Sequence, residues 1–546
     1  MTAAADLLLT SAEVHTLADP DETAAAVAVR DGRIVAVGPR FEVELLAGVE
    51  TEIVDCEGRV VLPGFVDAHT HLPMVGRRLV EADLGGADSP ADAVDRLAAR
   101  AAETASEETD REPDREWVVG FGYDESEWSE ARYLTRADLD AVSDERPVVA
   151  VREDMHLASL DSVALDRLRD EMPTDDVETD DAGDPTGVVV EDALDAVWAA
   201  IEPDREQMTE FVRAAGARAN GLGVVGVHDM VRESHAPRVY RDLDAAGELT
   251  LRVRINYWTD HLDAVRELGL RTNHGSEMVR TGAIKTFTDG SLGGRTAKLT
   301  EPYADAPGGE SAGDGGDGGD SDESDRGQWV VDPEELRDIV ARAEAADLQV
   351  AAHAIGDEAI AAVLDAFEAA GADGGGDDSG DGQRHRIEHA EVLTDDLIDR
   401  IAASDVVVSA QPNFLKWARE GGLYASRLGD ERRLASNRFG ALSAAGVPLA
   451  FGSDCMPLDP LFGVEQAVTA PADEQRLSVT GALRAYTRGA AYAGFDEDRL
   501  GTVEPGKLAD LVVLDESPWE VDPADIGDID VVRTLVGGET VFERSE

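Results

Sequence analysis

Two histidines separated by a single residue are the first feature of this sequence that could perform chemistry. His69 and His71 come shortly after the apolar run 61–66. Side chains alternate across a β-strand, so both imidazoles would point to the same face. Two neutral imidazoles placed in this way can bind one Zn²⁺-like ion at about 2.0–2.1 Å. A bare His-x-His pair can equally be structural, so its place in the fold must decide between the two interpretations.

Four further side chains of metal-ligand type lie at or near the ends of other candidate strands. Lys285 lies within the apolar segment 282–287, and three residues end candidate strands of their own: His353, His389 and Asp454. Taken singly, each has a structural explanation, such as a helix cap or a lysine whose tip reaches solvent. Six such residues at five strand ends are hard to explain in this way together. The sequence therefore predicts a centre for divalent metal, with zinc the expected metal.

The elements that must position these residues alternate short apolar runs with helical stretches, a pattern typical of βα units and a parallel sheet. Eight candidate strands have this rhythm, the number that closes a TIM barrel. They are Val60–His69, Val224–Asp229, Leu251–Trp258, Ala283–Thr288, Leu348–His353, Arg384–His389, Val406–Gln411 and Val447–Ser453. Active sites of such barrels lie at the carboxyl ends of the strands, where the ligand-type residues fall. The predicted fold class is α/β, a (β/α)8 TIM barrel.

Two regions extend this barrel. Residues 72–221 separate the first two candidate strands and contain strand-like and helical runs of their own. We interpret them as a large cap insertion over the barrel mouth, the alternative being a separate domain upstream of the barrel. Residues 1–60 and 501–546 carry short β-type runs, with an Asp31-Gly32 hairpin signal. They predict one small β-sandwich domain built from both ends of the chain, which leaves residues 61–500 for the barrel.

The charge of the chain excludes several classes of partner. The 546 residues include 114 acidic and 49 basic side chains, for a formal net charge of −65. Such a field repels nucleic acid and anionic membrane surfaces, so a small-molecule substrate is the expected partner, and a homodimer stays open. Self-repulsion on this scale is tolerable when it is screened, and the Debye length falls to about 3 Å in molar salt. This leads to the hypothesis of a halophilic protein in a salt-rich cytoplasm.

Other features of the sequence also favour a cytoplasmic location. The two cysteines, Cys56 and Cys455, cannot form a disulfide framework. Residues 1–10 lack the basic start of a signal peptide, and no apolar stretch approaches the about 20 residues that cross a bilayer. Three segments rich in Gly, Asp and Ser are expected to be solvated loops. They are Glu171–Gly187, Pro307–Gly327 and Gly371–Asp381.

Several of these motifs resemble those of a known family. The stretch Leu62–His71 closely resembles the opening motif of the amidohydrolase superfamily, and Gly452-Ser453-Asp454 resembles its closing motif. Three internal motifs are similar to those of the amidohydrolase 3, or YtcJ-like, branch, which includes the N-substituted formamide deformylases: Thr288–Ala297, His353–Asp357 and Arg386–Ala390. Gly501–Leu511 resembles the segment where the family chain re-enters its small β domain. The resemblance covers almost the whole chain and weakens in the cap and the acidic loops.

The resemblance implies a role for each ligand-type residue. His69, His71 and Asp454 would hold one metal ion, His353 and His389 a second, and Lys285, carboxylated by CO2, would bridge the two. A free ammonium cannot ligate a cation, so Lys285 either carries a carbamate or does not touch the metal, which leaves one or two ions open. The implied reaction is hydrolysis of a non-peptide carbon–nitrogen bond in a small amide or N-acyl compound. Asp454 would be the catalytic base, taking a proton from water and passing it to the leaving nitrogen.

Two other functions remain open from the sequence. A deaminase of the same superfamily would use one metal ion, and its metal content per chain would distinguish it. A non-catalytic descendant that only binds would be expected to have lost ligands, whereas all six positions hold competent residues.

Three residues outside the six are candidates for contacts to the substrate. Asp289 and Arg295 flank a Gly-rich turn after the Lys285 segment, where a salt bridge within the loop is the competing explanation. His156 resembles a cap histidine of the branch that reaches toward the substrate. His228 ends the second candidate strand and is interpreted as a structural histidine. Five aromatic residues could line an apolar pocket or belong to ordinary cores: Phe121, Tyr123, Trp128, Phe414 and Trp417.

Overall fold

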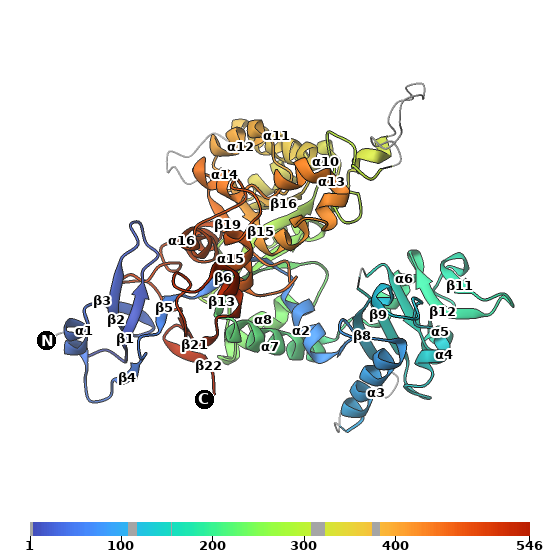
Figure 1. Ribbon diagram of the computed structural model, residues 1–546, viewed down its shortest axis with the longest axis horizontal. Helices are drawn as coiled ribbons and strands as arrows, with labels where there is room; N and C mark the ends of the chain where they lie inside the picture. The colour runs from blue at the N-terminus through green and yellow to red at the C-terminus, as the bar shows by residue number, and fades with distance from the viewer. Residues whose placement is uncertain (1–3, 107–116, 154, 307–322, 374–382, 546) are drawn as a thin grey trace. The chain divides into compact units, whose positions relative to one another are not determined.

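A computed structural model describes residues 4–106, 117–153, 155–306, 323–373 and 383–545 (Figure 1). The chain divides into two compact units, one made of residues 1–72 and 216–546 and the other of residues 73–215. Within the described residues, no helix combines the length and the apolar character needed to cross a membrane.

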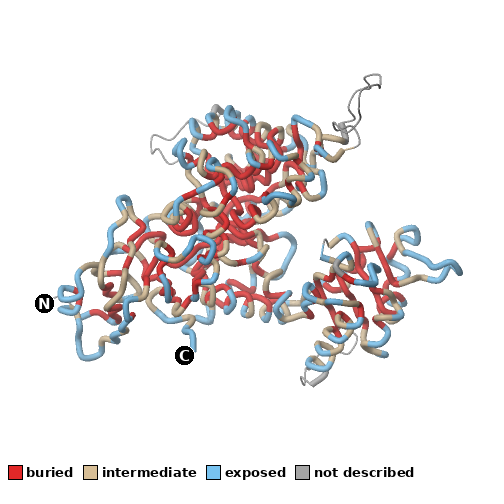
Figure 2. The backbone as a smooth tube through the Cα atoms, in the orientation of Figure 1, coloured by how far each residue is buried: buried red, intermediate tan, exposed pale blue. Residues whose placement is uncertain are grey.

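The first unit contains eight parallel strands in the order β19-β18-β17-β16-β15-β14-β13-β6. Their bounds are β6 Phe65–Thr70, β13 Val224–Val231, β14 Arg252–Trp258, β15 Val279–Phe287, β16 Val350–Ala354, β17 Arg386–His389, β18 Val407–Ala410 and β19 Leu449–Phe451. Every residue of β6, β13, β16, β17 and β18 is buried, as expected for parallel strands covered on both faces. Buried residues, drawn in red, fill the region of β6, β13 and β16 (Figure 2). All eight predicted barrel strands are present.

Helices follow the strands in the alternating order that the sequence predicts. They are α7 Arg205–Gly221, α8 Ala236–Ala246, α9 Leu262–Glu267, α10 Pro333–Glu344, α11 Asp357–Asp373, α12 Asp395–Ala402, α13 Leu423–Leu434, α14 Phe439–Ala444, α15 Pro460–Val468, α16 Val479–Arg484 and α17 Ala490–Ala493. Helix α10 illustrates the local signals. The side chain of Asp332 accepts hydrogen bonds from the N–H groups of Glu334 and Glu335, and Pro333 occupies the first helical position.

The sheet is a nearly closed barrel, because hydrogen bonds join its two edge strands at their carboxyl ends. The main-chain N–H of Asp454, which follows β19, donates to the carbonyl oxygen of His69 in β6 at 2.8 Å. The N–H of Ser453 donates to the carboxylate of Asp67 at 3.0 Å. The first and last barrel strands therefore meet where the predicted ligands lie.

The ends of the chain form one mixed sheet, in the order β22-β21-β20-β5-β1-β2-β3, with β4 also paired to β1. Its strands are β1 Leu7–His15, β2 Thr23–Arg30, β3 Arg33–Gly38, β4 Glu52–Asp55, β5 Val60–Pro63, β20 Leu511–Leu514, β21 Val531–Val536 and β22 Glu539–Glu543. Strand β5 pairs with β20, so the two ends share one sheet as predicted. The two-sheet sandwich is not confirmed, because β1 carries β4 along its first half and β5 along its second.

Two local features of this sheet bear on the sequence predictions. The predicted hairpin is present, and its central residues Asp31 and Gly32 have φ of 51° and 72°, as a type I′ turn requires. The first predicted barrel strand, 60–69, is two strands: β5 belongs to this sheet, and the barrel strand begins at Phe65.

Residues 73–215 contain a six-stranded sheet of their own, in the order β11-β12-β10-β9-β8-β7. Its strands are β7 Ala82–Asp83, β8 Val118–Tyr123, β9 Val148–Arg152, β10 Leu157–Leu160, β11 Val177–Thr179 and β12 Pro185–Val190, and its helices include α3 Pro90–Ser106, α4 Arg136–Leu139, α5 Ser162–Leu168 and α6 Asp192–Ala200. The unit follows β6 and precedes β13, and its position as a cap stays a prediction. Phe121, Tyr123 and Trp128 are at most 4% exposed and belong to its core clusters, which favours the packing explanation for these three aromatic residues.

One predicted loop is wrong and two fall largely outside the described residues. Glu171–Gly187 contains β11 and the start of β12, because Val177 pairs with Val189 despite the acidic composition around it. In Pro307–Gly327 only residues 323–327 are described, and in Gly371–Asp381 only residues 371–373.

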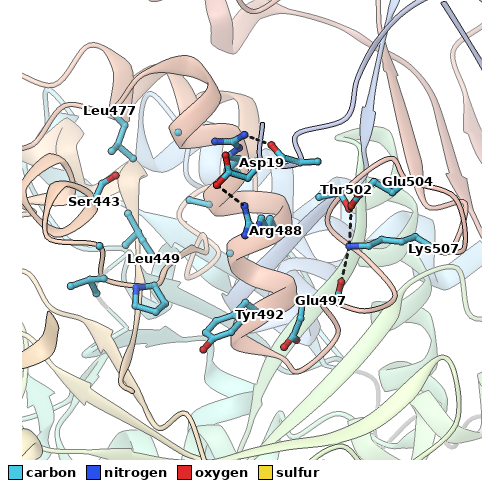
Figure 3. Close-up of a pocket in the computed structure, with 18 residues that line it drawn as sticks. Asp19, Ser443, Leu449, Leu477, Arg488, Tyr492, Glu497, Thr502, Glu504 and Lys507 are labelled. Atoms are coloured by element: carbon cyan, nitrogen blue, oxygen red, sulfur yellow. Dashed lines mark hydrogen bonds and ion pairs between the residues drawn. The ribbon is translucent and has the colours of Figure 1, made fainter. Parts of the chain in front are cut away.

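A cavity of about 850 Å³ opens at the amino end of β19, whereas Asp454 follows the carboxyl end of that strand (Figure 3). Its basic side chains are engaged by the chain itself. Arg484 and Lys507 donate to main-chain carbonyl groups at 3.1 Å and 2.7 Å, and Arg488 lies 4.0 Å from Asp19. These contacts join separate segments of the chain, and the amino face of a barrel is ordinarily concerned with stability.

Candidate metal centre

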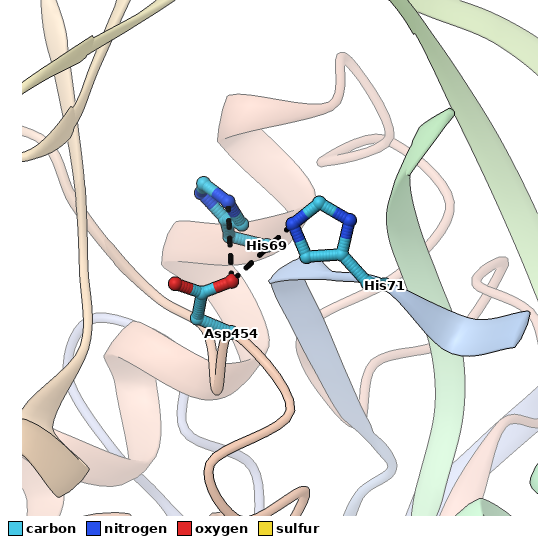
Figure 4. Close-up of side chains that lie close together, drawn as sticks. All are labelled: His69, His71 and Asp454. Carbon is cyan, nitrogen blue, oxygen red and sulfur yellow. Dashed lines mark ion pairs between the residues drawn. The ribbon is translucent and has the colours of Figure 1, made fainter. Parts of the chain in front are cut away.

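Three of the predicted ligands meet at the junction of β6 and β19 (Figure 4). One ligand-type atom from each of His69, His71 and Asp454 lies within 4.8 Å of the other two. The Oδ1 atom of Asp454 is 3.4 Å from Nε2 of His71 and 3.8 Å from Nε2 of His69. The His71 and Asp454 side chains are 37% and 17% exposed, so this part of the centre can be reached from solvent.

The other two predicted histidines continue this group. His353 in β16 and His389 at the end of β17 have ring centroids 4.4 Å apart, and the rings of His389 and His69 are 4.9 Å apart. Both side chains are buried. Strands β6, β16, β17 and β19 therefore bring four imidazoles and one carboxylate to the same end of the barrel.

Lys285 lies in β15, the strand that pairs with β16, which carries His353. Its side chain is 1% exposed, and its charge lowers the pKa of each of the four histidines. Its Nζ atom lies 5.1 Å from the centre of the Phe287 ring and makes no hydrogen bond or ion pair with any described residue. Burial lowers the pKa of Lys285 to about 8, against the opposing effects of Glu388 and Asp454.

Burial also sets the charge of the other ligand-type groups. It is the largest cause that lowers the pKa of His71 to about 4 and that of His353 to about 3, and it lowers the pKa of His69 and His389 as well. The four imidazoles are therefore neutral near pH 7 and keep a lone pair each. Burial raises the pKa of Asp454 to about 7, partly offset by the Lys285 charge.

The hydrogen bonds of the imidazoles fit a divalent cation. Nδ1 of His69 is 2.6 Å from the Glu388 carboxylate, and Nε2 of His353 is 2.9 Å from the carbonyl oxygen of Gly290. Each bond fixes one ring nitrogen as the donor and leaves the other free to ligate. Nδ1 of His389 is buried and has no hydrogen-bond partner among the described residues. A buried nitrogen in this state is costly unless something occupies it, and a metal ion would satisfy it.

Two of the ligand-type residues have strained backbones. His389 has a φ of 74° and Asp454 a φ of 50°, in the left-handed region that residues with a side chain rarely adopt. Each such residue costs about 1–3 kcal/mol. In both cases the turn comes where a barrel strand ends, so the strain belongs to the segment that aims the side chain.

The three residues predicted to contact the substrate, Asp289, Arg295 and His156, differ in burial and in the part of the chain where they lie. The buried carboxylate of Asp289 accepts hydrogen bonds from the N–H groups of Lys298, Ile355 and Gly356, and burial raises its pKa to about 7. It therefore ties the loop after β15 to the end of β16. Arg295 is 46% exposed on the side chain and pairs with Asp305 at 2.9 Å, as the alternative interpretation expected. His156 is an exposed residue of the unit 73–215.

Aromatic side chains flank the histidine pair His353 and His389. Phe287 stacks on His353 with ring centroids 4.3 Å apart, and Phe414 lies parallel to His389 at 6.2 Å. The ring of Trp417 lies next to that of Phe414, with centroids 4.8 Å apart, so two aromatic rows flank the pair: Phe287 beside His353, and Phe414 with Trp417 beside His389. Phe414 and Trp417 therefore lie beside the centre, as the pocket interpretation requires.

Three residues that support the centre were assigned no role from the sequence. Glu388 and Arg386 lie in β17 and are hydrogen-bonded to each other. Glu388 also contacts His69, and Arg386 donates to the carbonyl oxygen of Ala68. Asp67 accepts hydrogen bonds from the N–H groups of His69 and Ser453, both at 3.0 Å. The available signal was the presence of charged residues inside segments predicted as buried strands, Asp67 within 60–69 and Arg386 and Glu388 within 384–389.

Comparison with known proteins agrees with this geometry. The sequence pattern described as the amidohydrolase family matches residues 52–542. The chain is 29% identical to the amidohydrolase YtcJ of Bacillus subtilis, over 97% of this chain and 98% of the relative. It is 27% identical to the N-substituted formamide deformylase of Arthrobacter pascens, over 100% of both chains. A crystal structure of a metal-dependent hydrolase from Pyrococcus furiosus superposes with a TM-score of 0.76 at 30% identity, covering 95% of this chain and 99% of that one.

The match extends over almost the whole chain and includes both ends of the barrel. This chain therefore belongs to the amidohydrolase family, in the branch of YtcJ, and is a metal-dependent amidohydrolase.

Proposed function

We propose that this enzyme hydrolyses a non-peptide carbon–nitrogen bond in a small amide or N-acyl compound. The observation that carries the proposal is the convergence of four neutral imidazoles, a buried lysine and a half-buried carboxylate at one end of the barrel. The sequence similarity to an N-substituted formamide deformylase supports hydrolysis of a carbon–nitrogen bond of this type.

The ligand set divides into two groups around Lys285. His69, His71 and Asp454 would hold one divalent ion, and His353 and His389 a second, with zinc the expected metal. A buried ammonium without a hydrogen bond or ion pair is costly, which favours its conversion to another form. Addition of CO2 to the free amine forms an N–C bond, releases one proton and yields a carbamate anion. That anion could ligate both ions, so the carboxylated Lys285 would bridge them.

The catalytic step we propose belongs to Asp454. When bound, the metal would polarise the substrate carbonyl and make water acidic enough to attack near neutral pH. One oxygen of the Asp454 carboxylate faces the two imidazoles of the first group, and the other would accept the proton of the attacking water. Asp454 would then donate that proton to the nitrogen that leaves, acting as base and then as acid.

The substrate contacts remain part of the proposal. The aromatic rows beside His353 and His389 would contact the organic part of the substrate. Asp289 and Arg295 would act through the loop that follows β15, and His156 would contribute from the unit 73–215 acting as a cap. We also propose a cytoplasmic enzyme adapted to high salt, which works on small molecules and can assemble as a homodimer.

A substrate screen tests the proposal. Metal-replete enzyme is offered N-formyl and N-acyl amines, simple amides and ring amines that could be deaminated, and release of amine, acid or ammonia is measured. Metal-stripped enzyme is the control. Hydrolysis of an amide or N-acyl bond that depends on added zinc is the expected result. Ammonia release from the ring amines alone, with one ion per chain, would instead identify a deaminase.

A further inference from the structure

A continuous chain of buried polar side chains lies behind His69. The Glu388 carboxylate is 2.6 Å from Nδ1 of His69, and Arg386 donates from Nε to the other oxygen of Glu388 at 2.7 Å. On its far side Arg386 places Nη1 2.9 Å from Nδ1 of His228. All four side chains are at most 3% exposed. The side chains of the series His228–Arg386–Glu388–His69 are therefore shielded from bulk water, and their hydrogen-bond partners are one another.

The chemistry of the guanidinium determines where the protons of this chain lie. A guanidinium has only donors and stays charged in proteins, so Nδ1 of His228 must accept and its proton must be on Nε2. Both oxygens of Glu388 accept hydrogen bonds from Arg386, at 2.7 and 3.1 Å, and a carboxylate paired in this way with a guanidinium serves as an acceptor. Nδ1 of His69 must then carry the proton. The lone pair of His69 is left on Nε2, the nitrogen that lies 3.8 Å from Asp454.

We propose that Glu388 is a positioning residue of the metal centre, which fixes the tautomer and the ring orientation of His69 so that Nε2 points at the ion. The proposal rests on the metal ligands given under the proposed function. Glu388 does not touch the substrate or the reacting atoms in this account.

Arg386 makes this arrangement rigid. Its Nη2 donates to the carbonyl oxygen of Ala68 at 2.6 Å and to the hydroxyl of Ser409 at 3.0 Å, so it joins β6, β17 and β18. A second bond from Nη2 to Glu388 at 3.1 Å holds both carboxylate oxygens. Glu388 therefore cannot rotate away from His69 without leaving a buried guanidinium unpaired. Mutation of a residue that holds a metal-binding histidine in this way typically weakens metal affinity 10–100-fold.

The first experiment compares zinc affinity in two variants of the full chain. Glu388→Gln keeps the shape but loses the charge and one acceptor, so it cannot serve Arg386 and His69 together. Asp510→Asn is the matched control, because Asp510 forms a similar pair with a buried arginine, Arg252, at 2.9 Å. Arg252 begins β14, so this pair lies at the amino end of the barrel strands, opposite the metal ligands. Metal-free protein is titrated with zinc against a competing chelator, and the unfolding midpoint is measured in parallel.

We expect Glu388→Gln to weaken zinc binding 10–100-fold while Asp510→Asn stays within twofold of wild type, although both lower the unfolding midpoint. Wild-type zinc affinity in a folded Glu388→Gln variant would overturn the proposal. Absence of zinc binding in the wild type would instead overturn the ligand assignment on which the proposed function depends.

A second measurement needs no folded Glu388 variant. Ring-nitrogen NMR of the metal-free wild-type protein, labelled with ¹⁵N-histidine, reads the tautomer of each imidazole, and His69→Gln and His228→Gln identify the two signals. The proton is expected on Nδ1 of His69 and on Nε2 of His228. A proton on Nε2 of His69 would overturn the proposal.

Discussion

The main-chain N–H of Asp454 donates a hydrogen bond of 2.8 Å to the carbonyl oxygen of His69. This bond connects the first barrel strand with the last, across 385 positions of sequence. The two residues also face each other through their side chains, with Oδ1 of Asp454 3.8 Å from Nε2 of His69. Closure of the barrel therefore also brings together two of the residues proposed to hold the first metal ion.

Asp67 should contribute strongly to this closure. Its Oδ1 atom accepts from the N–H groups of His69 and Ser453, so Asp67→Ala leaves two buried donors without a partner. At about 1–3 kcal/mol for each unsatisfied group, the free energy of unfolding should fall by about 2–6 kcal/mol. Asp67→Asn retains a carbonyl oxygen and should lose much less. Denaturant unfolding of both variants checks this, and equal stability of Asp67→Ala and wild type would contradict it.

Metal content should depend on the His-x-His pair. Replacing both His69 and His71 by Ala removes two of the three groups that meet at the β6–β19 junction, so the first ion should be lost and activity with it. The double variant His261→Ala with His274→Ala, which changes two histidines outside the centre, should keep the wild-type metal content. Elemental analysis after dialysis distinguishes them. Undiminished metal in the first double variant would refute the assignment of these ligands.

Lys285 should be needed as a carbamate and not as a cation. Lys285→Ala should lower metal occupancy, and added short carboxylates should restore part of the activity by filling the same space. Lys285→Arg keeps a positive charge but cannot be carboxylated, so it should be as impaired as the alanine variant and should not be rescued. Full occupancy and rate in Lys285→Ala would mean that the lysine is structural.

The sequence predicted the barrel strands and the ligand-type residues at their ends because both depend on local pattern. The six residues lie in or at the ends of five candidate strands, and strand alternation needs no knowledge of the partner strand. The role of Glu388 could not be found in this way, because its partner His69 is 319 positions away and is brought near only by closure of the barrel. The prediction of a loop in the acidic segment around Val177 was wrong for a related reason. Its strand exists through pairing with Val189, which its own composition does not indicate.

Salt should stabilise the protein. The formal charge of −65 produces self-repulsion that is screened over about 3 Å in molar salt, so the unfolding midpoint should rise between low and molar KCl. The same experiment with a neutral osmolyte at equal osmolality separates screening from general exclusion effects. A midpoint that does not rise in KCl would contradict the salt-adaptation hypothesis.

Asp454→Asn tests the central claim most directly. Asparagine keeps a carbonyl oxygen for the metal and caps a following helix about as well as aspartate, but it cannot accept a proton from water. The variant should keep its fold and much of its metal, while kcat falls 10²–10⁴-fold, equivalent to about 3–5 kcal/mol of barrier, with little change in KM. Steady-state kinetics together with metal analysis gives the answer. A kcat within threefold of wild type in a metal-replete Asp454→Asn variant would contradict the assignment of Asp454 as the catalytic base.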